Sequence, residues 1–393
     1  MSPTFTETSH QSWFSRLGNA FKSLIIGLLL FVLSFPVLFW NEGRAVTTAR
    51  SLNEGQKQTV SVACDTVDRA NDGKLVHMSG LASTADVLCD EMFNVEVNAI
   101  RIQRIAEMYQ WEEDERTETD KTLGGGKKTT KTYQYSKEWS ASKIDSGNFR
   151  HPEGHKNPRT MLITPRMQTA SEVTLGAFQL SDDLVSNIRG SQTIGLDASN
   201  IPETFREQMR FVGGELYLGA DSESPQIGDI RVRFEATPAT EVSILAQQKN
   251  ASFQPYQTQA GDALSRLEMG MLSAEEMFAH ARTENSIFTW VLRALGSAIM
   301  LGGLMMLMSP LVIVGDVIPL VGSIVQGSTF LVAALITLIL APMTIAFAWF
   351  FYRPLVAVPL LIVSALAGYF LLRRGKSNSS PEVMTLDESD VVY

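Results

Sequence analysis

The residue types that catalysis or ligand binding would need do not occur here in the required spacing. GGGKKTT, residues 124–130, resembles part of a phosphate-binding loop, but Lys121 replaces the first glycine of that motif and Lys128 its serine or threonine. His151 and His155 have a spacing that suits a metal on a helix, but a proline and a glycine between them prevent that helix. Serine-nucleophile, zinc-protease and paired-cysteine motifs are also missing from the sequence. We therefore expect no catalytic residue, no cofactor and no metal.

Cys64 and Cys89 are the only two cysteines. In an oxidising compartment they could form a disulfide. Two free thiols fit the sequence as well, and spacing alone leaves both alternatives open.

Apolar residues are concentrated in two regions, Leu24 to Trp40 and Ala294 to Leu372. The second region contains only two charged residues, Asp316 and Arg353. Stretches of this length and polarity are typical of membrane-spanning helices. The chain is therefore predicted to be an integral membrane protein, with one polar block between two membrane regions.

Four transmembrane helices are predicted, one N-terminal and three C-terminal. Their ranges are 23–40, 288–314, 329–352 and 355–372. Residues 315–328 contain a proline and three glycines, so we expect a loop or a segment that re-enters the membrane. Residues 1–22 and the acidic residues 373–393 form the two tails, and residues 41–287 form the polar block.

Basic residues near the membrane indicate the orientation. Arg16 and Lys22 precede the first span, and three basic residues at 373–376 follow the last. Both tails are therefore predicted to be cytoplasmic, and residues 41–287 to be an extracytoplasmic domain, lumenal or periplasmic. Three arginines close to the membrane on the outer side count against this orientation: Arg44, Arg50 and Arg293.

A charged turn is predicted directly after the first span. Asn41 and Glu42 follow Trp40 without a spacer, and Gly43 and Arg44 come next. We expect Gly43 to allow a turn and the two charges to lie in the interface, where they are solvated. This junction would fix the angle between the membrane and the domain.

The polar block is predicted to be an α+β domain rich in antiparallel strands. Its clearest element is a long β-hairpin over residues 108–140, in which period-two spacing places five aromatic residues on one face. They are Tyr109, Trp111, Tyr133, Tyr135 and Trp139. This face packs on the rest of the domain or, alternatively, touches lipid or a partner.

Three further elements of the block can be predicted. Residues 182–189 form a helix, residues 228–248 form a hairpin, and Ser273 with Glu276 forms a capping box for a helix that leads to the second span.

Small residues recur at every fourth position of two spans. They are Ala294, Ala298 and Gly302 in the second span, and Ser364 and Gly368 in the fourth. Such faces bring helices close together, either within the bundle or between two copies in a homo-oligomer.

Asp316 and Arg353 are predicted to lie at opposite membrane faces, because a straight helix of residues 329–352 rises about 36 Å. Asp316 would lie beside the cytoplasmic headgroups and Arg353 at the outer turn. If residues 315–328 instead re-enter the bilayer, Asp316 is buried and becomes a proton-linked or ligand-linked site.

Several blocks in order along the chain resemble the LUMA family, the four-pass transmembrane protein 43 family. They are NEGRAV at residue 41, SLNEG at 51, MYQWEE at 108, GHKNP at 154, GDIRVRF at 228, SAEE at 273 and FYRPL at 351. The resemblance implies four spans and a large lumenal or periplasmic domain. It also implies an endomembrane location, in the endoplasmic reticulum and inner nuclear membrane of a eukaryote, or in the inner (plasma) membrane of a bacterium.

Two functions are compatible with these observations. The first is a non-enzymatic membrane scaffold that organises membranes and membrane protein complexes, with the lipid bilayer, other membrane proteins and further copies of itself as partners. The alternative is a lipid-handling protein linked to lipid metabolism. A nucleic acid is not an expected partner, because the net charge is −9 and no basic stripe occurs in the block.

Overall fold

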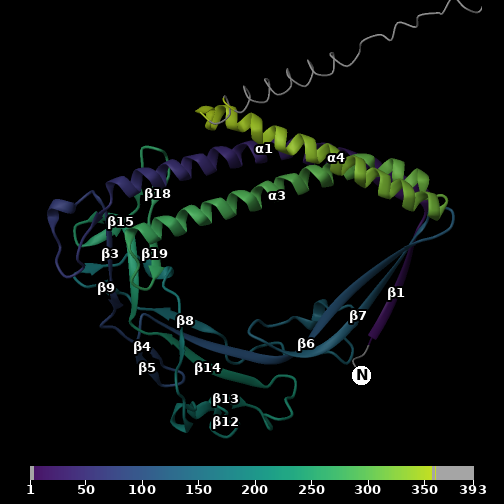
Figure 1. Cartoon of the computed structure of the whole chain (residues 1–393). Helices are drawn as coiled ribbons and strands as arrows, with labels where there is room; N and C mark the ends of the chain where they lie inside the picture. Colours follow the sequence, from purple (N-terminus) through teal and green to yellow (C-terminus); the bar gives the residue numbers. More distant parts are fainter. Residues whose placement is uncertain (1–3, 356–358, 360–393) are drawn as a thin grey trace, which may run out of the picture.

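The computed structural model describes residues 4–355 and residue 359, and three long helices form one layer of it (Figure 1). They are α1 (Trp13–Gln58), α3 (Ala274–Gly315) and α4 (Pro319–Tyr352). Each is long and apolar enough to cross a membrane. The predicted fourth span, residues 355–372, lies almost wholly outside the described residues. The prediction of a membrane protein with apolar helices on both sides of a strand-rich domain is therefore confirmed for three helices.

The helix α1 continues without a break through the predicted turn. It begins after Ser12, whose hydroxyl accepts a hydrogen bond from the backbone N–H of Ser15, and it ends at Gln58. The prediction of a turn at residues 41–44 is wrong, because these residues are helical. Asn41 and Glu42 are both fully buried against neighbouring helices, so the chain has no need to leave the helix to solvate them.

The other helix boundaries also differ from the prediction. The capping box of Ser273 and Glu276 is confirmed, but it starts α3 itself, so α3 begins well before residue 288. Helix α3 ends at Gly315, directly before Asp316, and α4 already begins at Pro319, a favourable residue for a first helical turn. Most of the predicted loop 315–328 is therefore helix, and the chain reverses within a few residues.

Residues 59–273 and the N-terminal strand β1 form the β domain, which holds two larger sheets among the described residues. The first sheet has the order β1-β7-β6-β14-β13-β12, with β8 beside β6 and β11 beside β14. All of its strand pairs are antiparallel. Its strands are β1 (Thr4–Gln11), β6 (Arg101–Lys121), β7 (Lys127–Ser140), β8 (Arg166–Thr169), β11 (Gln192–Thr193), β12 (Met209–Val212), β13 (Glu215–Leu218) and β14 (Ile230–Thr237).

The second sheet has the order β10-β9-β3-β15-β16, with β19 beside β15 and β2 beside β3. Only the short β2–β3 pair is parallel among the described strands. Its strands are β2 (Val60–Ser61), β3 (Leu75–Ser83), β9 (Thr174–Leu175), β10 (Phe178–Gln179), β15 (Thr240–Lys249), β16 (Ser252–Gln254) and β19 (Arg266–Met269). The pairs β4 (Val87–Asp90) with β5 (Val95–Asn98) and β17 (Tyr256–Gln257) with β18 (Ala263–Leu264) are separate. The antiparallel, strand-rich α+β class is therefore confirmed.

Two local predictions within the domain need correction. Strands β14 and β15 follow one another in the chain but belong to different sheets, so residues 228–248 do not form a hairpin. A strand pair interrupted by Pro238 can diverge there, because each strand finds a longer partner elsewhere, β14 on β6 and β15 on β3. The predicted helix 182–189 is only α2 (Asp182–Ser186).

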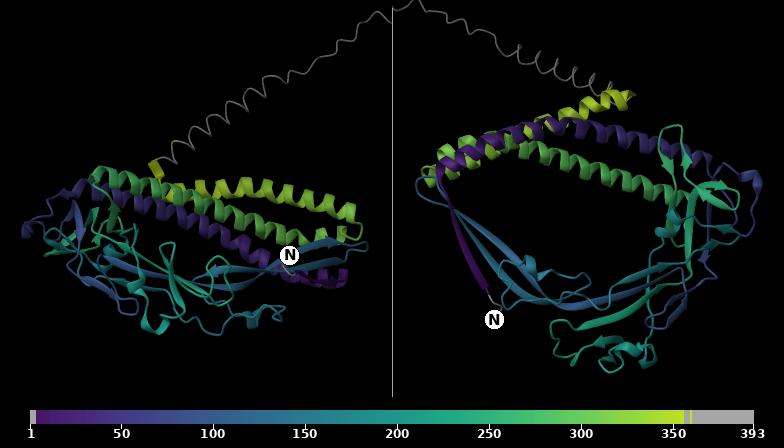
Figure 2. Two further views of the ribbon diagram at one scale, coloured as in Figure 1. Left: turned by 90° about the horizontal axis from the view of Figure 1, so that it is seen from below. Right: turned by 180° about the vertical axis from the view of Figure 1, so that it is seen from behind.

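The long hairpin of β6 and β7 is confirmed, and it reaches far from the rest of the domain. Figure 2 shows it running beneath the helical layer, from the β domain at one end of the helices to their opposite end. The strand β6 has 21 residues and α1 has 46, so each extends for about 70 Å. The N-terminal strand β1 pairs with β7 from Thr4 opposite Gln134 to Gln11 opposite Lys127.

Within the described part of the chain, four hydrophobic clusters hold these elements together. Two lie in the β domain, one around Phe178 and Ile244 and one around Phe93 and Phe234. A third joins the domain to the helices through Leu52 of α1 and Phe278 of α3. The fourth packs α1, α3 and α4 on one another.

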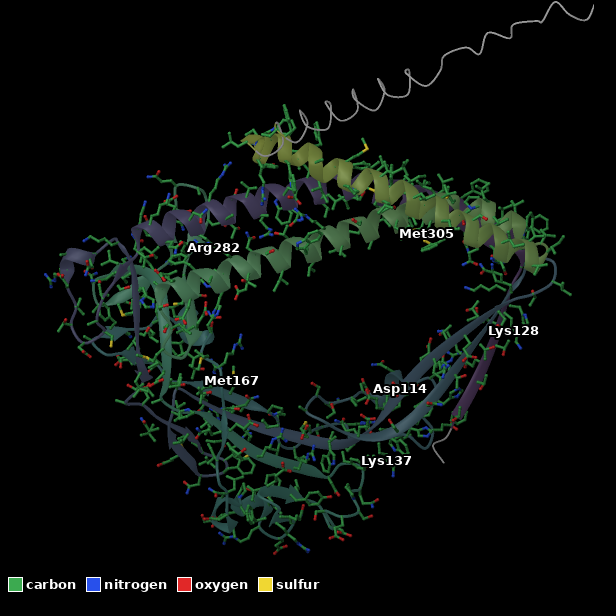
Figure 3. All side chains as sticks on the ribbon, viewed as in Figure 1. Asp114, Lys128, Lys137, Met167, Arg282 and Met305 are labelled. Carbon is green, nitrogen blue, oxygen red and sulfur yellow. The ribbon has the colours of Figure 1, made fainter. Side chains whose placement is uncertain are left out.

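Charged side chains gather on the long hairpin, and exposed apolar side chains gather on the helical layer. Figure 3 shows Asp114, Lys128 and Lys137 on the long hairpin, with Met305 on the helical layer. Large apolar side chains of the helices are exposed, as with Trp290 at 65% and Leu338 at 70%. The helical layer therefore needs a lipid environment, and the hairpin needs water.

Candidate functional site

Charged residues meet inside the helical layer at the level of the predicted junction. Glu42 of α1 is fully buried. Its Oε1 lies 2.7 Å from Nε of Arg293, and its Oε2 accepts hydrogen bonds from Arg293 at 2.9 Å and from Nε1 of Trp349 at 2.7 Å. One carboxylate thus joins α1, α3 and α4. A buried bidentate pair of this kind is strongly oriented and is costly to break from one side.

Neighbouring polar groups extend this contact along α1 and α3. Asn41 donates to the carbonyl of Thr289 at 3.1 Å. Arg44 donates to Oδ1 of Asn285 and to Oγ1 of Thr289, both at 3.0 Å. We call the group the central polar cluster, which consists of Asn41, Glu42, Arg44, Thr289, Arg293 and Trp349.

Gly43 permits close helix packing rather than a turn. A Cβ atom at this position would lie only 2.6 Å from the ring of Tyr352 in α4. The predicted role of the four junction residues is therefore corrected. Asn41, Glu42 and Gly43 are buried and Arg44 is partly buried, and together they join three helices instead of forming a surface turn.

A second charged contact lies at the other end of the layer. Asp316, also fully buried, accepts from Arg16 at 2.5 Å and from Nζ of Lys121 at 2.7 Å. Arg16 belongs to α1, Lys121 to the tip of the long hairpin, and Asp316 to the turn between α3 and α4. We call these three residues the end latch.

Backbone contacts strengthen the end latch. The indole of Trp13 donates to the carbonyl of Ile313 at 2.8 Å, and the amide of Gly124 donates to the carbonyl of Val317 at 3.2 Å. Arg16 also donates to the carbonyl of Gly125. The hairpin tip is therefore attached to the helices by charged groups and by main-chain groups.

The end latch changes the predicted position of Asp316. We expected an interfacial aspartate, with Arg16 on its side of the membrane and the polar block on the other. Arg16 from residues 1–22 and Lys121 from residues 41–287 both bind Asp316, and the membrane side of each segment stays a prediction. Arg353 lies at the far end of α4, with its guanidinium 5.8 Å from the centre of the Trp349 ring.

The five hairpin aromatics share one face, and that face is largely covered. Tyr109 lies opposite Trp139, and their rings are 5.2 Å apart. The ring of Tyr135 stacks on His155 at 3.9 Å, and Trp111 meets the same imidazole edge-on at 4.8 Å. Tyr133 is buried beside these residues.

The two histidines therefore pack against aromatic rings. His151 stacks on Phe5 of β1 at 4.3 Å, and no cluster of three metal-ligating side chains occurs within the described residues. Burial, together with the hydrogen bond that the hydroxyl of Tyr135 donates to Glu113, raises the pKa of Tyr135 to about 12. This phenol stays protonated at neutral pH and serves packing.

The small residues of α3 do not make the close contact between the helices. Ala294 and Ala298 are exposed, and a Cβ on Gly302 would meet nothing within 4 Å. The close approach uses the next residue, Gly303, where a Cβ would lie 2.7 Å from the backbone nitrogen of Phe31, and Gly27 in α1. Ser364 and Gly368 lie outside the described residues.

Both cysteines are free thiols in this structure. Burial raises the pKa of both thiols. The negative charge of Asp65 raises the pKa of Cys64 further, and that of Glu96 raises the pKa of Cys89 further.

The sequence alone did not single out several residues of these two contacts. The sequence pattern marks Arg16 and Arg293 only as basic residues near the membrane and Lys121 only as a mismatch to a phosphate loop, and it gives no role to Trp349. A usable signal existed for Arg293, because it is the last charge before an apolar stretch and therefore a candidate partner for Glu42.

Comparison with known proteins decides the family. Residues 108–354 match the family described as Transmembrane protein 43. The chain belongs to the transmembrane protein 43 family. It is 35% identical over 377 residues to human Transmembrane protein 43, covering 92% of each chain, and 34% identical to the mouse protein over 89% of each. The transmembrane protein 43 homolog of Drosophila melanogaster is 28% identical over 87% of this chain and 92% of its own. No solved structure matches this member of the transmembrane protein 43 family.

Proposed function

We propose that this protein is a non-enzymatic membrane scaffold whose β domain is held in a fixed position against the helical layer. The observation that carries the proposal is the attachment of the domain at two distant places. At one end Leu52 and Phe278 pack into the domain, and at the other end Lys121 of the hairpin tip binds Asp316.

Two attachments restrict the motion of the domain far more than one. A domain joined to its helices only at one end would swing about that junction, whereas a second contact about 55 Å along the helices removes this freedom. A surface with a fixed position relative to the membrane is suited to assembling other proteins, because partners bind without the entropic cost of ordering it. The remaining surface of the long hairpin is polar and accessible to such partners.

Crosslinking in native membranes followed by identification of the partners tests the scaffold. Wild-type protein should yield a reproducible set of membrane proteins, and Asp316→Asn, which weakens the hairpin attachment, should reduce their yield without loss of membrane insertion. Lys128→Gln, a charge removal on the same hairpin at a side chain that forms no ion pair with the end latch, serves as the matched control. Recovery of the same partners at the same yield from Asp316→Asn would contradict the proposal.

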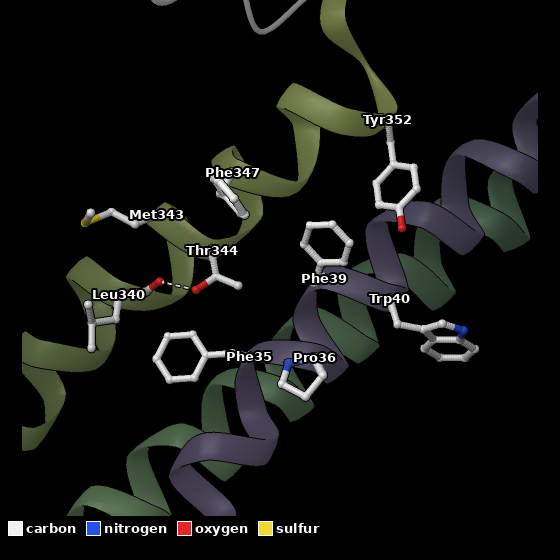
Figure 4. Close-up of a pocket in the computed structure, with 9 residues that line it drawn as sticks. All are labelled: Phe35, Pro36, Phe39, Trp40, Leu340, Met343, Thr344, Phe347 and Tyr352. Carbon is white, nitrogen blue, oxygen red and sulfur yellow. Dashed lines mark hydrogen bonds between the residues drawn. The ribbon is translucent and has the colours of Figure 1, made fainter.

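A lipid-handling role is the second candidate, and one feature favours it. A groove of about 770 Å³ lies between α1 and α4, lined by apolar residues such as Phe35, Phe39, Met343 and Phe347 (Figure 4). Lipid chains can fill such a groove within a bilayer. A scaffold role needs no specific lipid, so stable co-purification of one lipid species with wild-type protein, lost in Phe39→Ala, would favour this alternative.

A further inference from the structure

A cleft of about 500 Å³ opens where α1, α3 and strand β19 meet. Along α3 its lining changes from the polar Glu284 and Asn285 to the apolar Ile287, Phe288 and Val291. This change takes place within about two helical turns. The cleft therefore crosses the boundary between the polar domain and the membrane part of the helices.

Two arginines line the polar part of the cleft, and each has an unused donor. Nε of Arg44 and Nε of Arg266 are buried and have no hydrogen-bond partner among the described residues. The other nitrogens of Arg44 donate to neutral groups, Asn285 and Thr289. Buried donors without partners are unfavourable, so an acceptor that enters the cleft would satisfy them.

The two arginines of the cleft differ in their anionic partners: Arg266 is paired with two carboxylates, whereas Asp262 and Glu42 act on Arg44 only from beyond ion-pair distance. Arg44 has no carboxylate within ion-pair distance among the described residues, and its guanidinium lies 4.7 Å from the Phe288 ring centre. Arg266 shares one nitrogen between Glu268 at 3.2 Å and Glu284 at 2.8 Å. The side chain of Glu284 is 62% exposed. An exposed ion pair of this kind contributes little to stability, so Glu284 can move away from Arg266 when another anion approaches.

We propose that this cleft binds an anionic phospholipid, with the phosphate at Arg44 and Arg266 and one acyl chain along Ile287, Phe288 and Val291. Arginine presents several donors in a plane and suits phosphate oxygens. The adjoining apolar side chains suit the first part of a fatty acyl chain. A zwitterionic lipid binds less well, because its cationic headgroup adds positive charge beside two arginines.

Native mass spectrometry of the full-length protein in detergent, titrated with phosphatidylglycerol and phosphatidylcholine of identical chains, tests the site. We expect wild-type protein to retain phosphatidylglycerol preferentially. Arg266→Gln should weaken this retention roughly tenfold, as for the loss of one charged hydrogen bond. Glu284→Gln should strengthen it, because the competing carboxylate is removed, whereas a merely structural role of Glu284 predicts no gain.

Arg282→Gln is the matched control, since it removes a positive charge from α3, which lines the cleft, at a position outside the cleft. Its lipid retention should equal that of wild-type protein. Equal retention of both lipids by wild-type protein, or no change in Glu284→Gln, would overturn the proposal. Displacement of phosphatidylglycerol by excess inorganic phosphate would show a phosphate site that needs no lipid chain, and would overturn the lipid assignment.

Discussion

Nζ of Lys121 lies 2.7 Å from Oδ1 of Asp316, although 195 residues separate them in the chain. This contact joins the tip of the long hairpin to the turn between α3 and α4. Because Asp316 is fully buried and also binds Arg16, its carboxylate holds three segments at one point.

Removing this carboxylate should release the hairpin tip. Asp316→Asn leaves Arg16 and Lys121 close together without their anion. Breaking one side of a buried ion pair costs about 3 to 5 kcal/mol, and the partial exposure of Lys121, at 28%, places our expectation at the lower end. Limited proteolysis within residues 122–126 should become faster by at least an order of magnitude. Lys128→Gln should cleave at the wild-type rate, and protection that persists in Asp316→Asn would show that the backbone contacts suffice.

The N-terminal strand and the hairpin should lie on the same side of the membrane. Thr8 lies opposite Thr130 in the β1–β7 ladder. In a cysteine-free background, Thr8→Cys with Thr130→Cys should crosslink under mild oxidation in native membranes, and a membrane-impermeant thiol reagent should label both from one side. Labelling of the two positions from opposite sides would restore the orientation that the basic residues indicate.

The pair of Glu42 and Arg293 should behave as a coupled unit. Glu42→Leu alone leaves Arg293 buried without its anion and should lower the free energy of unfolding by about 3 to 5 kcal/mol. The double variant Glu42→Leu with Arg293→Met should recover most of this loss, because replacing both members of a buried pair by apolar residues is often neutral. Thermal unfolding in detergent of wild-type protein, of each single variant and of the double variant measures the coupling between the two residues. Additive effects of the two substitutions would refute it.

Adjacent glycines of α3 should respond differently to substitution. Gly303→Leu collides with the backbone of Phe31 and should destabilise the packing of α1 on α3, seen as a lower melting temperature. Gly302→Leu meets open space, so the monomer should retain its stability. If the face of Ala294, Ala298 and Gly302 joins two copies, Gly302→Leu should also abolish homotypic crosslinking. Crosslinking that survives would exclude this face as the dimer contact.

Both thiols should react slowly at neutral pH. The pKa values of Cys64 and Cys89 are raised, chiefly by burial, and only the thiolate attacks an alkylating reagent. Iodoacetamide labelling of the folded protein should therefore accelerate only when the pH rises above the ordinary thiol range, and intact mass without reductant should show two free thiols. A mass lower by two hydrogens would demonstrate a disulfide.

The sequence by itself determined the helices and strands whose formation depends on residues close to one another in the chain. Uninterrupted apolar stretches identify the helices, alternation of aromatics identifies the hairpin at residues 108–140, and Ser273 with Glu276 identifies the start of α3. These signals depend on neighbours a few residues away. Family membership could be inferred in the same way, from short blocks in order along the chain.

Tertiary structure decided how the polar residues of the helices are used. Asn41 to Arg44 look like a turn because charges beside an apolar span are normally solvated, yet Arg293 and Trp349 supply partners from more than 250 residues away. Asp316 looks interfacial until Lys121 is brought to it by a strand long enough to run beside the helices. Partners that are distant in sequence leave no local pattern, so only the folded chain shows that these charges are paired and buried.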